Sequence, residues 1–101
     1  MLYAWEKFHS AIHLLVGTGT QRERLASAYT YNLSQLKPED LPEEIQEDFR
    51  QLKAEITRVD PHGNKGSVKA TLHEMDESDI RRMIEKIISM HDTVTRHQEP
   101  F

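Results

Sequence analysis

"ESDIRRMIEKIISMHDTVTRH", residues 77 to 97, is the stretch that decides the fold. Its apolar residues recur every three or four positions, which is the spacing of one face of an α-helix. On a helical wheel they cover an arc of roughly 160°, so we expect this helix to contact more than one neighbour. Asp76 is a favourable N-cap for it. The apolar residues are Ile80, Met83, Ile84, Ile87, Ile88, Met90 and Val94.

Three earlier segments show the same helical spacing of apolar residues: 2 to 16, 21 to 36 and 42 to 59. The connections between the first helices are short, which favours antiparallel neighbours in an up-down bundle. The residues expected to form the core are Trp5, Phe8, Ile12, Leu25, Leu33, Phe49, Leu52, Ile84 and Ile87.

Residues between these segments carry helix-ending and helix-starting signals. Gly17 can take the left-handed conformation that ends a helix, and Thr20 with Glu23 matches a capping box for the next one. Pro38 and Pro42 cannot continue a preceding helix but suit the first turn of a new one. The second helix should therefore end before Pro38, and the third should begin near Pro42.

The segment before the last helix has a different pattern of apolar residues. In "SVKATLH", residues 67 to 73, apolar and polar residues alternate, which indicates a short irregular or extended segment. The loop "DPHGNKGS" before it is rich in turn formers, and Gly63, Asn64 and Gly66 are expected to supply positive φ angles. The sequence thus predicts one all-α domain over residues 1–101, a four-helix up-down bundle with that segment between the third and fourth helices.

Composition restricts the classes of function. The chain has 101 residues, a formal net charge of -4 and no cysteine, which excludes disulfides, thiolate zinc sites and cysteine nucleophiles. The longest apolar run, "AIHLLV", is far shorter than the roughly 20 residues of a membrane span. No secretory signal is evident, so we expect a cytoplasmic protein that contacts no membrane. The acidic charge and the lack of a basic patch with interleaved aromatic residues weigh against nucleic-acid binding.

The stretch "WEKFHSAIH", residues 5 to 13, places Glu6, His9 and His13 on one side of the first helix. Two imidazoles four residues apart can share one transition-metal ion, so His9 and His13 are candidate metal ligands. Glu6 and His9 form the only Glu-x-x-His in the sequence, whereas di-iron bundle proteins have two. The zinc-protease spacing His-Glu-x-x-His is absent. The alternative is a polar flank beside the apolar face, and the sequence indicates no cofactor.

His91 lies within the apolar arc of the last helix. A buried neutral imidazole needs hydrogen-bond partners, and Tyr29 or Glu23 could supply one across the bundle. The three residues are therefore a candidate buried polar site. Such a pair would fix the register of the helices, tune a pH response or line a pocket.

Acidic residues are concentrated at the start of the third helix. Part of this charge complements the helix dipole, and the remainder could bind a basic partner. The candidate partner-binding acidic face consists of Glu43, Glu44, Glu47 and Asp48.

These observations lead to three hypotheses of function. The first is a small interaction or regulatory protein without catalytic activity, binding a protein partner or forming a homodimer through spare apolar surface of the last helix. The second is a bundle that binds a metal or small molecule through His9, His13 and His91. An enzyme is the least favoured of the three, because the sequence shows pairs of acid/base residues but no complete catalytic set.

Overall fold

The computed structural model describes residues 2–60 and 66–98. This part of the chain is all-helical and contains no strand, as the sequence predicts, but it has five α-helices where four were expected. Two short 3₁₀ helices lie between the second and third. The elements are α1 Leu2–Leu15, α2 Gln21–Tyr31, η1 Leu33–Gln35, η2 Pro38–Asp40, α3 Glu43–Ile56, α4 Ser67–Glu74 and α5 Glu77–Arg96.

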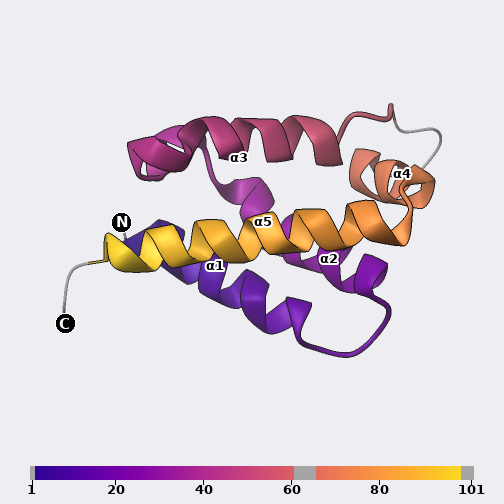
Figure 1. Ribbon diagram of the computed structural model, residues 1–101, viewed down its shortest axis with the longest axis horizontal. Helices are drawn as coiled ribbons and strands as arrows, with labels where there is room; N and C mark the ends of the chain where they lie inside the picture. The colour runs from indigo at the N-terminus through magenta and orange to yellow at the C-terminus, as the bar shows by residue number, and fades with distance from the viewer. Residues whose placement is uncertain (1, 61–65, 99–101) are drawn as a thin grey trace.

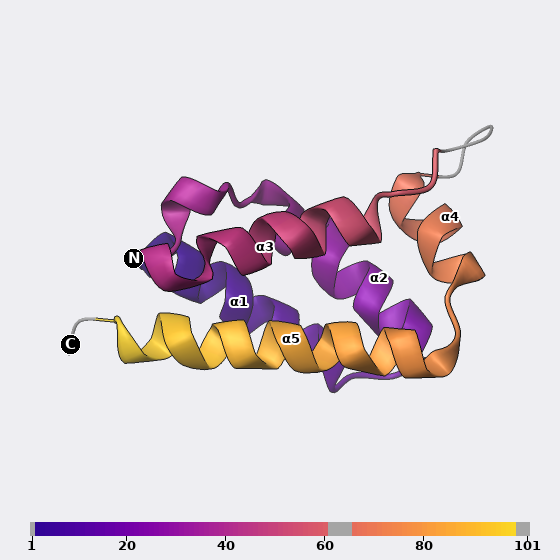
Figure 2. The same cartoon turned by 45° about the horizontal axis from the view of Figure 1, so that its top comes forward.

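The longest helix, α5, organises the others. It runs the length of the molecule (Figures 1 and 2), and Figure 1 shows α3 on one side of it and α1 and α2 on the other. The short helix α4 lies at the end where α5 begins and packs against α2 and α3. Figure 1 also shows that α1 and α5 run in opposite directions, so the start of α1 lies beside the end of α5. The broad apolar arc of α5 thus contacts α1, α2 and α3, as its width predicts.

The core is formed by apolar side chains from all five helices and η1. Phe8 of α1 and Phe49 of α3 meet edge to face, with ring centroids 6.5 Å apart. Of the nine predicted core residues, Trp5, Ile12 and Ile84 are only partly buried and pack against the core. The other six are fully buried: Phe8, Leu25, Leu33, Phe49, Leu52 and Ile87.

The prediction of an irregular or extended segment at residues 67 to 73 was wrong, because these residues form the two-turn helix α4. Helical spacing places Thr71, Leu72 and Met75 on one face, and all three are buried. The hydroxyl of Thr71 also accepts a hydrogen bond from the backbone N–H of Val59 at 3.0 Å. Packing against α2 and α3 thus stabilises a helix that is too short to form alone.

The second helix is shorter than predicted and ends at Tyr31. Beyond it the side chains of Ser34 and Gln35 donate to the carbonyl groups of Thr30 and Tyr31, which satisfies acceptors at the helix end. The chain continues as η1, and this change of direction keeps Leu33 and Leu36 buried. Apolar spacing therefore extended the predicted helix past its true end.

The predicted caps are correct at two helix starts. The capping box of Thr20 and Glu23 is present, and the Asp76 carboxylate accepts from the backbone N–H of Asp79 at 2.8 Å. Among the described residues only Gly19 has a positive φ, of 97°, so the left-handed position in the α1–α2 connection is Gly19 rather than Gly17.

Part of the loop between α3 and α4, residues 61–65, lies outside the described residues. Two of the three expected turn formers, Gly63 and Asn64, fall in this part. The third, Gly66, has a φ angle of -72° and is the N-cap of α4, so the prediction of a positive φ at this residue was wrong. None of the described helices combines the length and apolar character needed to cross a bilayer.

Candidate functional site

The contact between α1 and α5 defines how their side chains meet. The indole N–H of Trp5 donates to the hydroxyl of Thr95 at 3.1 Å, and the rings of His9 and His91 lie 6.4 Å apart between centroids. In each pair the residue numbers add up to the same value, as in two antiparallel helices in constant register. Continuing that register places Ile12 at the level of Ile88.

Helical spacing then gathers a continuous set of side chains along this contact. Residues 5, 9, 12 and 13 lie toward one side of α1 with residue 16 directly after the helix, and residues 84, 88, 91 and 95 share one side of α5. We call this set the seam strip. Its apolar and imidazole members are Trp5, His9, Ile12 and His13 from α1, Val16 directly after α1, and Ile84, Ile88 and His91 from α5.

Imidazole rings form the centre of the seam strip. The ring of His9 stacks on the Trp5 indole with centroids 4.6 Å apart and an interplanar angle of 13°. On its other side the Nε2 atoms of His9 and His13 lie 3.2 Å apart, within hydrogen-bond distance. In such a bond one Nε2 atom carries a proton and donates, and the other presents its lone pair and accepts. Both imidazoles are exposed and accessible to a ligand.

His91 is partly buried beneath these rings. Its Nε2 atom is shielded from solvent and has no hydrogen-bond partner in the described part of the chain. Burial lowers the pKa of His91, and the nearby His9 lowers it further, while the negative charge of Asp92 acts in the opposite direction. The neutral imidazole is therefore favoured at this position.

The seam strip also exposes apolar area. Ile88 is 44% exposed, and Val16, the first residue after α1, is 77% exposed. Ile12 and Ile84 are partly buried between them and the core. The members named above are uncharged when the histidines are neutral, and the acidic residues Glu6, Glu85 and Asp92 are their immediate neighbours in sequence.

The predicted polar site of His91, Tyr29 and Glu23 is not joined by hydrogen bonds among the described residues. The carboxylate of Glu23 accepts a hydrogen bond from the backbone N–H of Thr20 at 2.8 Å, and hydrogen bonding with Thr20 lowers the pKa of this carboxylate. Tyr29 is almost fully buried, and this burial raises the pKa of its hydroxyl to about 12. Glu23 thus acts in a helix cap.

The predicted acidic face lies on the outer side of α3, where all four carboxylates are exposed. Two of them have partners: Glu44 bonds to the imidazole of His97, and Glu47 pairs with Arg50 at 3.2 Å. Neighbouring groups therefore compensate part of the charge.

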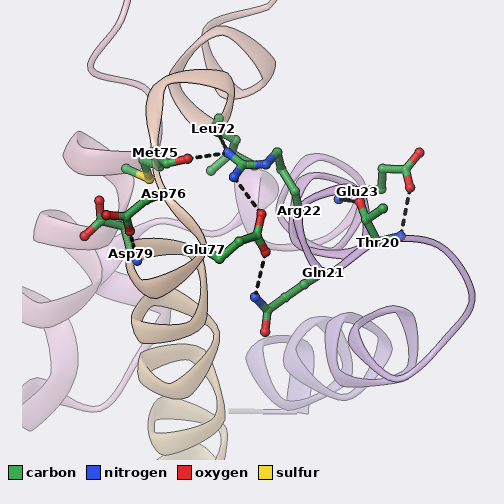
Figure 3. A network of polar contacts seen from close by, with 9 residues as sticks. All are labelled: Thr20, Gln21, Arg22, Glu23, Leu72, Met75, Asp76, Glu77 and Asp79. Carbon is green, nitrogen blue, oxygen red and sulfur yellow. Dashed lines mark hydrogen bonds and ion pairs between the residues drawn. The ribbon is translucent and has the colours of Figure 1, made fainter.

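A cleft of about 590 Å³ lies between α2, α4 and Val59, and no pattern in the sequence predicts it. The Arg22 side chain lines its edge and hydrogen-bonds to the carbonyl groups of Leu72 and Met75 at the end of α4 (Figure 3). It also pairs with Glu77 at 2.8 Å. Arg22 thereby connects the start of α2 to the turn between α4 and α5.

No group of three or more potential metal-ligating side chains occurs within residues 2–60 and 66–98. His9, His13 and His91 are neighbours, but within one chain they do not form a three-ligand site. Comparisons with protein-family models, with curated proteins and with solved structures gave no match to this chain. The function is therefore inferred from the contacts and charges of the chain itself.

Proposed function

We propose that this chain is a small helical interaction protein without catalytic activity, which self-associates through the seam strip. The observation that carries the proposal is the exposed apolar and aromatic surface along the contact of α1 with α5. Ile88 and Val16 are exposed and Trp5 is partly exposed, and all three belong to the seam strip. Contiguous exposed apolar residues rimmed by polar ones are typical of protein interaction sites.

The charge pattern favours a second copy as the partner. A two-fold interface brings the same surface of both copies together, so the surface must be compatible with itself. The seam strip contains only neutral side chains when its histidines are unprotonated. The outer face of α3, by contrast, carries four carboxylates and would repel its own copy.

The experiment is sedimentation equilibrium of the metal-free chain over a wide range of concentrations, with the variant Ile88→Glu. A carboxylate at the centre of the interface would be desolvated without a partner, so the substitution should weaken self-association at least about tenfold.

The matched control is Leu14→Glu. Leu14 is 38% exposed, similar to Ile88, and lies on the side of α1 away from the strip. This variant should associate as the parent chain does. A parent chain that stays monomeric at millimolar concentration contradicts the proposal, as does equal weakening by the two substitutions.

A further inference from the structure

We propose that His9 and His13 bind one Zn²⁺ ion through their Nε2 atoms, and that a second copy of the chain supplies the same two residues to complete a four-imidazole site. This inference rests on the self-association proposed above. It adds a ligand to the seam strip and gives its exposed histidines a chemical role.

The distance between the two nitrogens fits a shared metal ion. Zinc binds histidine nitrogen at about 2.0–2.1 Å in tetrahedral geometry, which places two adjacent nitrogen ligands about 3.3 Å apart. The Nε2 atoms of His9 and His13 are 3.2 Å apart. An ion can therefore replace the hydrogen bond between the rings once the donating ring carries its proton on Nδ1 instead of Nε2, which frees both Nε2 lone pairs for the metal.

The surroundings of the pair favour ligation. Both rings are exposed, so the ion can reach them from solvent. The Trp5 indole stacks on His9 and is itself fixed by its hydrogen bond to Thr95, which restricts the orientation of the imidazole before the ion arrives. Imidazole suits zinc, copper and nickel, and zinc prefers four ligands in a closed site.

One chain supplies only two of the four ligands. The described residues offer no group of three metal-ligating side chains, and the Nε2 atom of His91 is buried away from solvent. A two-fold axis through the ion would bring an equivalent pair from the second copy. Acidic neighbours help to compensate the charge of the ion, because Glu6 lies one turn before His9 and the chain carries a net charge of -4.

The test is a titration of the metal-free chain with zinc chloride, followed by calorimetry and by sedimentation. We expect one ion per two chains and a shift of the sedimenting species to dimer. His9→Ala and His13→Ala should each weaken zinc binding by more than about tenfold. His73→Ala is the control, because His73 is an exposed histidine on α4, away from the strip, and its loss should change neither stoichiometry nor affinity.

Failure of this inference is distinguishable from failure of the proposed function. Self-association without metal, with no zinc binding lost in His9→Ala, would overturn the zinc site alone. One ion per chain on a species that remains monomeric would overturn the bridged site. A chain that stays monomeric both with and without zinc would overturn both.

Discussion

The substitution Phe49→Ala tests how the core holds the helices around α5. The Phe49 ring is fully buried, meets Phe8 edge to face and has the Lys53 ammonium group 5.5 Å from its centroid. Truncating a buried phenylalanine costs about 3–5 kcal/mol, of which an aromatic pair accounts for about 0.5–1.5 kcal/mol. A domain of this size is typically stable by about 5–15 kcal/mol, so this loss is a large fraction of the total free energy of unfolding.

The assay is urea denaturation followed by circular dichroism at 222 nm, with fluorescence of the single tryptophan as a second probe. Phe8→Ala and the double variant complete a double-mutant cycle, in which the two losses should not be additive because the rings are in contact. A loss below about 1 kcal/mol for Phe49→Ala, or full additivity with Phe8→Ala, would refute this description of the core.

Three further predictions concern titrating and charged groups. Burial lowers the pKa of His91 below its ordinary 6.5, so the unfolded chain binds this proton more readily. The contribution of His91 to the free energy of unfolding of the chelator-treated protein should therefore be constant above about pH 6.5 and fall as the pH drops through the folded-state value. His91→Gln should flatten the acid side of the measured stability curve. Burial raises the pKa of Tyr29 to about 12, so the contribution of its neutral hydroxyl to stability should be complete below about pH 10 and be lost as the pH rises toward 12. An absorbance titration at 295 nm should lose its last phase in Tyr29→Phe. An unchanged curve would contradict the burial of this hydroxyl. Arg22→Met leaves the Leu72 and Met75 carbonyl groups without their donor and should cost about 1–3 kcal/mol. Glu77→Gln removes the charge that pairs with Arg22 and alters the hydrogen bond from Gln21, both at a largely exposed carboxylate, and should cost less than about 1 kcal/mol. Equal losses in thermal melts would count against the role given to Arg22.

Most helix starts could be predicted from the sequence because their signals are local. The Thr20 and Asp76 caps and the apolar spacing of α1, α3 and α5 depend on residues within one or two turns. The helix α4 was missed because the alternation of Val68, Ala70 and Leu72 resembles a strand, and only packing on α2 and α3 selects the helix. The end of α2 was missed for a similar reason, since leucines beyond it are buried in another backbone conformation.

The candidate site could be predicted only in part. The spacing of His9 and His13 places their side chains on one face of α1, and their close approach is a local contact. The approach of His91 to His9 depends on the packing of α5 against α1, which spacing alone does not define. The cleft beside Arg22 depends likewise on contacts between residues about 50 positions apart, for which the sequence carries no local signal.

Self-association through the seam strip is the central claim, and sedimentation equilibrium of the metal-free parent chain beside Ile88→Glu and Leu14→Glu tests it most directly. We predict a concentration-dependent dimer for the parent chain and for Leu14→Glu, and a dissociation constant at least about tenfold higher for Ile88→Glu. A parent chain that sediments as a monomer at every concentration would contradict the claim.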